Sequence, residues 1–455
     1  MDNFLSFVIY WGVWLIVPIF IDGLTTLLSL FAVVVGRIRQ FASKSPALEY
    51  FPVVSIIVPV YNSEKTLEAC LRSISDQDYP RERIEIFLIN NGSSDRSFDI
   101  FADVQEGGKL SLSWHSIINK GKAWALNAGI HLAHGKFIFN IDSDVVLAPD
   151  AIRRVVEAME VDPNLGAVTG AVQVLSPPEE ASPLQRILAE CEFFEYLTAF
   201  HVGREYQSLL RNLYTLSGAF SIFRREVLIR TFLYSQETVS EDTDLTFEIY
   251  ERFPEYRVGF VHNAVAYVHP VESLGALYSQ RVRWQRGQVE VSARHERLMR
   301  RPVWQLFRFA PARVLTIDHT LAFPRIVWTF LLPVLVLFGY SLSQILMAQL
   351  FIYGFYLLID LAWIGVAWTG TNAAAQSRLY RFWWLLPLMP LYRMIIFWFR
   401  FSGFLNAVAE PGTWRVQDPI DQIVNGLCEL RQTALNVIRS VWHPFGGVKI
   451  PDKFK

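Results

Sequence analysis

The stretch Phe137-Ile138-Phe139-Asn140-Ile141-Asp142-Ser143-Asp144 decides the fold that we expect for this chain of 455 residues. A mostly apolar, β-prone run leads directly into two carboxylates separated by one serine. A short apolar run with polar boundaries favours a buried parallel strand, although its periodicity also allows a helix. Along an extended chain, Asp142 and Asp144 would share one side at the carboxyl end of the strand. Ligands bind at that edge of an open α/β sheet.

The two aspartates have no basic residue beside them in the sequence, so they repel each other unless a cation lies between them. Cations that prefer oxygen ligands, such as Mg²⁺ or Mn²⁺, suit such a pair. The same residues could also be two aspartates in a solvated turn, and the pattern Asp-x-Asp alone does not decide between these interpretations. The motifs around Asp142 and Asp144 must show whether this is a cation site or a solvated turn.

Composition divides the chain into a soluble middle and two apolar ends. Hydrophobic residues make up 52% and charged residues 19% of the chain, whereas about 25% of an ordinary soluble domain is charged. The net charge of -1 does not indicate a nucleic-acid partner. Cys70, Cys191 and Cys428 form neither a disulfide framework nor a zinc pattern, and they favour a reducing, cytoplasmic setting.

The N-terminal stretch from Phe4 to Val35 contains Asp22 as its only ionisable residue apart from Tyr10. Its length and composition predict one tilted membrane span with an interfacial turn. Basic residues follow at positions 37, 39 and 44. The positive-inside rule therefore places residue 40 onward in the cytoplasm.

The C-terminal third predicts two more spans, at Ile326 to Tyr340 and Ile345 to Trp368. The block Phe382 to Phe399 carries two prolines and an arginine, which predicts a kinked span or a re-entrant element. The side of the membrane on which the tail lies stays open. We expect a transmembrane segment at 1–45, a cytoplasmic domain at 46–301, interfacial and transmembrane helices at 302–410 and a tail at 411–455. The protein would then be a multi-pass protein of the cell membrane.

Between the apolar ends, the chain alternates between predicted strands and helices, which is the pattern of an α/β domain with a mostly parallel sheet. Strands are predicted at Val53–Val60, Ile84–Ile89 and the opening run, and helices at Glu64–Ser75, Ala123–Leu132, Ala151–Met159 and Leu245–Glu251. Lys120 and Lys122 precede the helix that begins at Ala123. Lysines beside a helix N-terminus favour a diphosphate ligand.

Several motifs resemble those of family 2 glycosyltransferases and occur in the same order. They are Val-Pro-Val-Tyr-Asn at 58–62, Asn-Gly-Ser-Ser-Asp at 91–95, Gly-Lys-Ala-Trp-Ala-Leu-Asn at 121–127, Asp-Ser-Asp at 142–144, Ser-Gly-Ala at 217–219, Ser-Glu-Asp at 240–242 and Gln-Arg-Val-Arg-Trp at 280–284. The last motif narrows the resemblance to membrane-embedded synthases like those of cellulose, chitin and hyaluronan, and to related glycolipid synthases. The resemblance implies a nucleotide-sugar-binding domain of the GT-A type, flanked by transmembrane and interfacial helices.

The resemblance also implies a role for each motif residue. Asp144 would hold the metal ion, Mg²⁺ or Mn²⁺, and Asp142 would contact both the metal and the donor. Donor or nucleotide contacts would come from Tyr61, Asn91, Lys122, Asp142 and Arg283. Asp242 would be the general base of a single inverting step. Ser217, Gly218 and Trp284 would bind the acceptor.

Each of these assignments has a structural alternative. Lys122 could be a solvated lysine at a helix start, and Ser240 or Asp242 could simply cap a helix. The basic stretch that begins at Gln280 predicts an amphipathic helix along the membrane surface, and such helices normally face lipid headgroups. The sequence at 217–219 could be a turn of small residues.

Two departures from the family pattern concern the donor and the C-terminal region. Asn90 and Asn91 stand where the family usually carries an aspartate pair, or Asp-Asn, that reads uracil. An amide both accepts and donates, so uracil could be bound through a different hydrogen-bond pattern. Gly-Thr-Trp-Arg at 412–415 resembles a synthase signature in altered order, and we assign it no role.

The resemblance implies a membrane-bound inverting glycosyltransferase that moves a sugar from a nucleotide-diphosphate sugar, expected to be a UDP-sugar, to a growing polysaccharide. A non-processive synthase of a membrane glycolipid and a catalytically silent scaffold that binds nucleotide sugar are the alternatives. The expected partners are the donor, a carbohydrate or lipid acceptor, membrane lipids, and a second copy or an export protein. The sequence does not reveal the sugar, the linkage or the acceptor.

Overall fold

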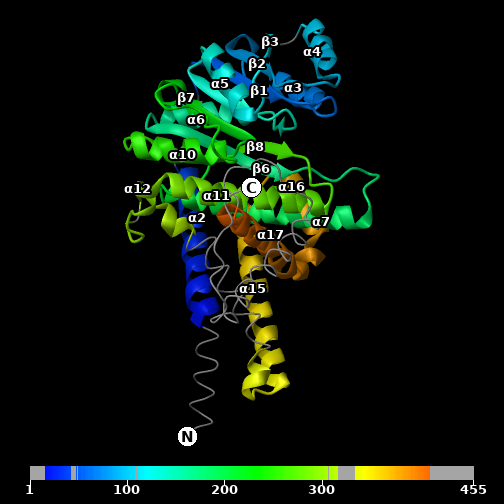
Figure 1. Cartoon of the computed structure of the whole chain (residues 1–455), viewed down its shortest axis with the longest axis vertical. Coiled ribbons are helices and arrows are strands. Elements are labelled where there is room, and N and C mark those ends of the chain that lie inside the picture. The colour runs from blue at the N-terminus through cyan, green and yellow to red at the C-terminus, as the bar shows by residue number, and fades with distance from the viewer. Residues whose placement is uncertain are drawn as a thin grey trace, which may run out of the picture.

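The computed structural model describes residues 16–42, 48, 50–108, 111–305, 307–315 and 334–409. A mixed β-sheet with helices on both faces forms one half of the molecule, and helices α2 (Leu24–Ala42) and α15 (Leu342–Gly370) extend away from it on the same side (Figure 1). Helix α11 (Leu274–Arg294) lies between these two parts. The predicted domain limits stay predictions.

The sheet has the strand order β3-β2-β1-β4-β7-β6-β8-β5. The strands are β1 (Val54–Val60), β2 (Ile84–Asn90), β3 (Leu112–Ser116), β4 (Phe137–Ile141), β5 (Val146–Leu147), β6 (Leu165–Val174), β7 (Phe220–Arg224) and β8 (Arg257–Val268). Strands β3, β2, β1 and β4 pair in parallel, as predicted, but β7 is antiparallel to both β4 and β6, and β5 is antiparallel to β8. Strand β6 is parallel to β8, so four of the seven strand pairs follow the predicted parallel arrangement and the sheet is mixed at β7 and β5. The chain between β6 and β7 begins and ends at one edge of the sheet, so β7 must run back.

The remaining helices connect these strands or follow them. In the first half of the chain they are η1 (Ile16–Gly23), α3 (Leu67–Ser75), η2 (Arg81–Arg83), α4 (Ser97–Glu106), α5 (Lys122–Leu132), α6 (Ala151–Val161), α7 (Pro183–Glu195), η3 (Tyr196–Val202), α8 (Gly203–Leu209) and α9 (Arg225–Leu228). Further on they are α10 (Glu241–Arg252), α12 (Glu296–Met299), α13 (Pro311–Val314), η5 (Leu335–Phe338), α16 (Ala373–Arg381), η6 (Trp383–Leu388) and α17 (Met389–Ala409). Segments η1 and η3 are π-helices, and η2, η5 and η6 are 3-10 helices.

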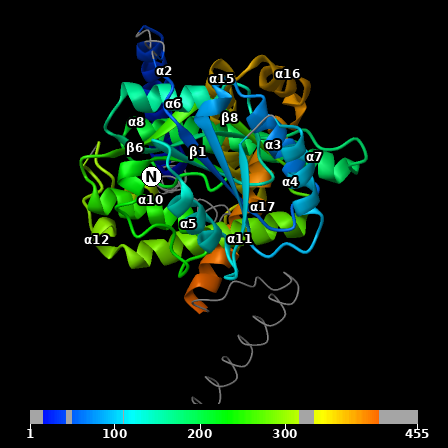
Figure 2. The same cartoon turned by 90° about the horizontal axis from the view of Figure 1, so that it is seen from above.

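Alternation along the strands builds an apolar layer on each face of the sheet. Val54, Ile56 and Val58 face the layer that contains α3 and α6, whereas Ile57 faces the layer that contains α5 and α10. All five residues of β4 are buried. Burial on both faces is the reason that these strands are nearly continuous apolar runs. Figure 2 shows the helices around the sheet from above.

Helix α11, which carries the Gln-Arg-Val-Arg-Trp motif, buries one face against the protein, and its place along a membrane surface stays a prediction. Arg281 is fully buried, and Gln285 and Arg286 are buried as well. Helix α17 packs closely on it, because a Cβ atom at Gly403 would lie 2.6 Å from the carbonyl oxygen of Val282. The basic residues suggested a headgroup-facing surface; other parts of the protein cover Arg281 and Arg286, whereas Arg283, Arg294, Arg297 and Arg300 are exposed.

Helix α15 is the one helix in the described part of the chain that is long and apolar enough to cross a membrane by itself. Helix α16 and the stretch Trp383–Ala407 bend by 68° and together qualify as a broken span or a re-entrant loop. The bend lies at the start of the block 382–399 rather than at its prolines, so the predicted kinked span or re-entrant element stays a prediction. The predicted span at 326–340 lies mostly outside the described residues, as do Cys428 and the sequence at 412–415.

Candidate active site

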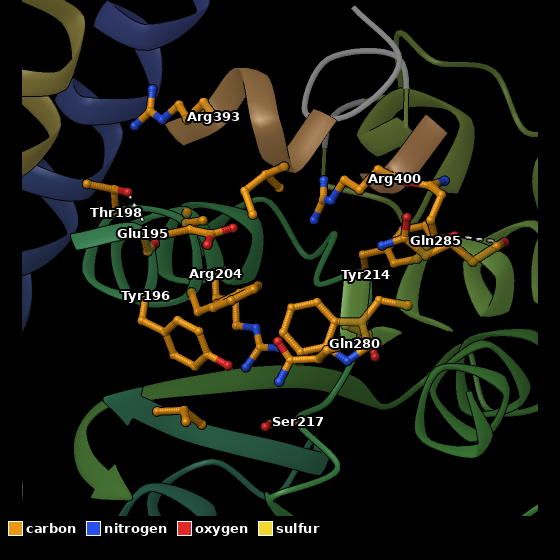
Figure 3. A pocket seen from close by; sticks show the side chains of 18 of the residues that line it. Glu195, Tyr196, Thr198, Arg204, Tyr214, Ser217, Gln280, Gln285, Arg393 and Arg400 are labelled. Carbon is orange, nitrogen blue, oxygen red and sulfur yellow. Dashed lines mark hydrogen bonds between the residues drawn. The ribbon is translucent and has the colours of Figure 1, made fainter. Parts of the chain in front are cut away.

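A cavity of about 1170 Å³ lies at the carboxyl end of β4. It continues between helices α2, α15 and α17 and the sheet with its covering helices, which we call the central domain. Figure 3 shows side chains around part of this cavity, including Ser217 near the sheet and Arg393 and Arg400 on α17. Of the predicted site residues, it is lined by Lys122, Asp142, Asp144, Ser217, Gly218, Asp242, Arg283 and Trp284. The structure thus brings together residues that are up to 162 positions apart in the chain.

Tyr61 and Asn91 do not line this cavity. They follow β1 and β2, whose carboxyl ends lie at the same edge of the sheet as the end of β4. Tyr61 is 61% exposed. The Oδ1 atom of Asn91 accepts a hydrogen bond from the backbone N–H of Gly121 at 3.0 Å. Asn91 therefore holds the loop that leads into Lys122, and Gly121 has a φ of +134° that favours glycine there.

Lys122 and Asp142 form an ion pair, with 2.6 Å between Nζ and Oδ1. The expectation that the aspartate pair lacks a basic neighbour is therefore wrong, because α5 starts beside the end of β4. Strand β4 also ends at Ile141, so the alternation argument does not reach Asp142 and Asp144. The two aspartates nevertheless line one cavity.

The ammonium group of Lys122 is surrounded by acidic groups. Glu241 lies 3.9 Å from it, in addition to Asp142. Burial alone would lower the pKa of Lys122, but Asp142 and Glu241 outweigh burial, so the net pKa is raised. Lys122 therefore carries a full positive charge at neutral pH, as a group that binds a diphosphate must.

Gly218 lies between Lys122, on one side of the site, and Asp242, on the other. Its carbonyl oxygen accepts hydrogen bonds from Lys122 Nζ at 3.2 Å and from Asn140 Nδ2 at 3.1 Å. A Cβ atom at Gly218 would lie 3.1 Å from Asp242 Oδ2. A larger residue at position 218 would therefore crowd the carboxylate of Asp242, which would have to shift by a few tenths of an ångström.

Asp242 is positioned by the first turn of α10. Its Oδ1 atom accepts a hydrogen bond from the N–H of Thr243 at 2.7 Å. Ser240 is the N-cap residue but makes no capping hydrogen bond with its side chain. Thr246 Oγ1 donates to the carbonyl of Asp242 and accepts from the N–H of Leu216, so α10 is tied to the segment that leads into Gly218.

Trp284 lies between a cation and an aromatic ring. The guanidinium of Arg281 is 4.3 Å from its ring centroid, and Phe200 packs against it at 5.5 Å and 85°. Trp284 also lines the cavity, as does the exposed side chain of Arg283. Arg281 thus fixes the indole, while Arg283 stays available to a ligand.

Asp142 and Asp144 fit a divalent cation when a ligand completes the coordination. Both carboxylates line the cavity, and the Asp142 side chain is 26% exposed. In the described ranges, no group of three or more His, Cys, Asp or Glu side chains could hold a metal ion. Mg²⁺ is often held by one or two carboxylates together with phosphate oxygens and water. The two aspartates therefore suit a cation that arrives with a diphosphate.

Sequence reasoning missed Asn140, Glu241 and Arg204. Asn140 could have been noticed as the only polar residue in an otherwise apolar buried strand. Glu241 lies within a recognised motif, but its contact with Lys122 depends on the fold. Arg204 lies in a stretch that none of the motifs covers.

Comparisons with known proteins identify a domain that holds part of this site. The family described as Glycosyl transferase family 2 matches residues 55–232. The chain carries a family 2 glycosyltransferase domain. Its motifs at 58–62, 91–95, 121–127, 142–144 and 217–219 all lie within the matched range.

Two curated relatives of the glycosyltransferase domain are poly-beta-1,6-N-acetyl-D-glucosamine synthases. The one from Staphylococcus epidermidis is 29% identical over 241 residues, which is 53% of this chain and 56% of the relative. The one from Staphylococcus aureus is 27% identical over 279 residues, which is 61% of this chain and 65% of the relative. The chain thus spans less than two thirds of the length of these relatives.

A solved structure shows the fold of the glycosyltransferase domain. It is a mannosyltransferase from Pyrobaculum calidifontis in complex with GDP-mannose and Mn²⁺, which matches with a TM-score of 0.53 and 20% identity over 87% of this chain and 99% of that chain. The architecture is therefore the GT-A type with a mixed sheet.

Proposed function

We propose that this protein is a membrane-bound inverting glycosyltransferase that transfers a sugar from a nucleotide-diphosphate sugar, expected to be a UDP-sugar, to a growing polysaccharide. The observation that carries the proposal is one cavity that joins groups suited to a diphosphate with a carboxylate suited to an acceptor hydroxyl. The two sets meet at Gly218, which contacts Lys122 and leaves room for Asp242.

The donor would lie along the edge formed by β2, β1 and β4. Tyr61 and Asn91, at the ends of β1 and β2, would face the nucleotide. Lys122 and Arg283 would bind the diphosphate, which a compact ammonium group and a planar guanidinium both suit. Asp142 and Asp144 would hold Mg²⁺ or Mn²⁺, which when bound would neutralise the charge of the departing diphosphate.

The acceptor would enter from the opposite side of Gly218, beside Ser217 and Trp284. In one step, the acceptor hydroxyl oxygen forms a bond to the anomeric carbon while the bond from that carbon to the diphosphate oxygen breaks. Asp242 takes the hydroxyl proton, and the nucleotide diphosphate leaves with the electron pair. Attack opposite to the leaving group inverts the anomeric carbon. The indole of Trp284 would support the apolar face of the acceptor sugar.

A membrane location is supported by the apolar helix α15 and the bent pair that follows it. The cavity reaches residues of both α15 and α17, including Tyr356 and Arg393. Such a continuation would receive the product as it leaves the catalytic domain. We place this domain in the cytoplasm, where nucleotide sugars are made available to synthases of this kind.

The relatives' product makes N-acetylglucosamine the first donor sugar to test. We would screen UDP-sugars for release of UDP by the purified full chain, with and without Mg²⁺ or Mn²⁺. Asp242→Asn should keep donor binding and lose turnover, because an amide cannot take the proton. Asp244→Asn is a matched control on the same helix, since Asp244 bonds to His295 rather than lining the cavity.

The outcomes separate the three hypotheses. Metal-dependent UDP release with a polymeric product supports a polysaccharide synthase, whereas a single chloroform-soluble product would identify a glycolipid synthase. Donor binding without turnover would identify a scaffold. Unchanged turnover in Asp242→Asn would remove this residue from the mechanism.

A further inference from the structure

Arg204, in the first turn of α8, has an incomplete set of partners. It lines the cavity, and its Nη1 atom is buried without a hydrogen-bond partner among the described residues. Burial lowers the pKa of Arg204 to about 10, and the charge of Asp242 partly opposes this shift. Burying a polar or charged group without partners is costly, and such groups in native proteins require an explanation.

Three other arginines that are buried or half-buried have carboxylate partners. They are Arg37 with Glu205 at 2.6 Å, Arg281 with Glu195 at 2.7 Å, and Arg378 with Glu190 at 2.8 Å. These pairs attach α2, α11 and α16 to helices of the central domain. Glu205 follows Arg204 directly in the chain, yet its carboxylate binds Arg37. Arg204 therefore lacks the carboxylate partner that gives the other three arginines a structural role. A purely structural role does not explain its position.

The neighbours of Arg204 are aromatic side chains of the cavity. Its guanidinium lies 5.0 Å from the ring centroid of Phe200. Phe200 in turn packs edge-on against Tyr196 at 4.7 Å and against Trp284 at 5.5 Å. Arg204 and Trp284 therefore contact the same ring. Figure 3 shows Arg204 between Tyr196 and Gln280, above Ser217.

The backbone before Arg204 is a π-helix, η3, which occupies Tyr196–Val202. Short π-helical turns are rare and often mark functional sites, because they shift the faces of the helix that follows. Tyr196, Phe200 and Arg204 recur at intervals of four residues, and all three line the cavity. The π-helix thus brings two aromatic rings and a guanidinium to one wall.

We propose that Arg204 is an acceptor-binding residue that donates hydrogen bonds to oxygen atoms of the saccharide receiving the new sugar. Asp242, which must face the acceptor hydroxyl, is the carboxylate whose charge acts on Arg204. Lys122 and Asp142, on the donor side, already pair with each other. Parallel N–H donors suit neighbouring sugar oxygens, and the aromatic wall suits the apolar face of the ring.

This inference rests on the proposed function, and its test separates acceptor binding from donor binding. The test uses the full chain in detergent, with UDP-N-acetylglucosamine as donor and short β-1,6-linked N-acetylglucosamine oligomers as acceptor. Arg204→Gln should raise the acceptor KM roughly 10- to 100-fold and leave the donor KM and the affinity for UDP within about twofold. Arg204→Lys should recover part of the loss, because it retains the charge.

Arg230→Gln is the matched control. The guanidinium of Arg230 also lies over a phenylalanine, 4.7 Å from the ring centroid of Phe253, but Arg230 is exposed and does not line the cavity. This variant should change neither KM. If the glutamine variant at position 204 does not fold, the lysine variant supplies the same comparison.

A binding measurement keeps the inference separate from the proposed reaction. The oligomers are titrated into the protein without donor, and tryptophan fluorescence reports their binding. Without UDP release in the wild type, the proposed function fails, yet weaker oligomer binding in Arg204→Gln would still support the inference. Unchanged oligomer binding and acceptor KM would overturn it. An equal rise of the donor KM, with loss of UDP affinity, would overturn it too, by placing Arg204 on the donor.

Discussion

Replacing Arg281 with methionine should destabilise the protein strongly. Arg281 is fully buried in α11, and its Nη2 atom lies 2.7 Å from Glu195 Oε2 and 3.9 Å from Glu192 Oε1. Tyr392 of α17 donates a hydrogen bond to the same Glu195 oxygen at 2.8 Å. The carboxylate of Glu195 thus joins α7, α11 and α17.

The expected loss follows from the carboxylates that Arg281→Met leaves behind. Removing one partner of a buried ion pair costs about 3–5 kcal/mol, because the remaining charge is buried without compensation. For a chain of this size, that loss corresponds to a fall in Tm of roughly 3–5 °C. The solvent-exposed pair of Arg72 and Glu68 is the control. Arg72→Met should cost only about 0.3–0.5 kcal/mol, as for other exposed helix pairs.

The pH dependence gives a second, sharper test of Arg281→Met. Burial first of all raises the pKa of Glu192 to about 7, against the opposing effects of the Val271 N–H and of Arg281. Without Arg281 the pKa of this carboxyl must rise further, so the folded variant binds more protons than the unfolded one. Its stability then falls as the pH rises, by linkage. The difference in Tm from the wild type should therefore widen between pH 6 and pH 8.

The measurement is thermal unfolding of the detergent-purified chain, followed by tryptophan fluorescence. The double variant Arg281→Met/Glu195→Gln should be more stable than Arg281→Met alone at pH 8, because the amide removes one of the two carboxylates that lost their counter-charge. A Tm of Arg281→Met close to that of Arg72→Met would refute the reasoning. So would a double variant no more stable than the single one.

Two further predictions concern the site and the helix that carries Asp242. Gly218→Ala should lower kcat by at least about tenfold without a matching loss of Tm. The Cβ atom of the alanine would lie 3.1 Å from Asp242 Oδ2 and displace this catalytic base. A normal kcat would show that the loop can move aside. His295 bonds to Asp244 and Glu251, and although burial lowers its pKa, these carboxylates outweigh burial and raise it. Its contribution to stability is therefore complete below pH 6.5 and is lost as the pH rises through the higher folded value, so the Tm advantage of the wild type over His295→Gln should shrink across that range.

The sequence correctly predicted the features that depend on residues close together in the chain. The strand expected at Ile84–Ile89 forms β2 (Ile84–Asn90), since an apolar run between turn residues leaves few alternatives. Helix α3 buries Leu67, Cys70, Leu71 and Ile74 on one face, as their spacing requires. The resemblance selected residues from seven separate motifs, and most of them line one cavity.

What the sequence could not predict depends on partners distant in the chain. Lys122 and Asp142 are twenty positions apart, and only the parallel pairing of β1 with β4 brings their loops together. The direction of β7 depends on the edge at which the preceding helices return the chain. Neither feature could be predicted from the sequence, because local periodicity does not specify which elements become neighbours.

The arginines show why the charge of a sequence window does not determine the exposure of each residue in it. The window from Gln280 to Arg301 is basic, and the expected consequence was a surface helix. Arg281 is instead buried, because Glu195, 86 positions earlier, supplies its counter-charge. Arg204 is surrounded by protein but lacks such a partner for its Nη1 atom. Both residues would look alike in a sequence. Their partners distinguish them: an arginine paired within the protein contributes to stability, whereas one that faces a cavity without a partner is available to a ligand.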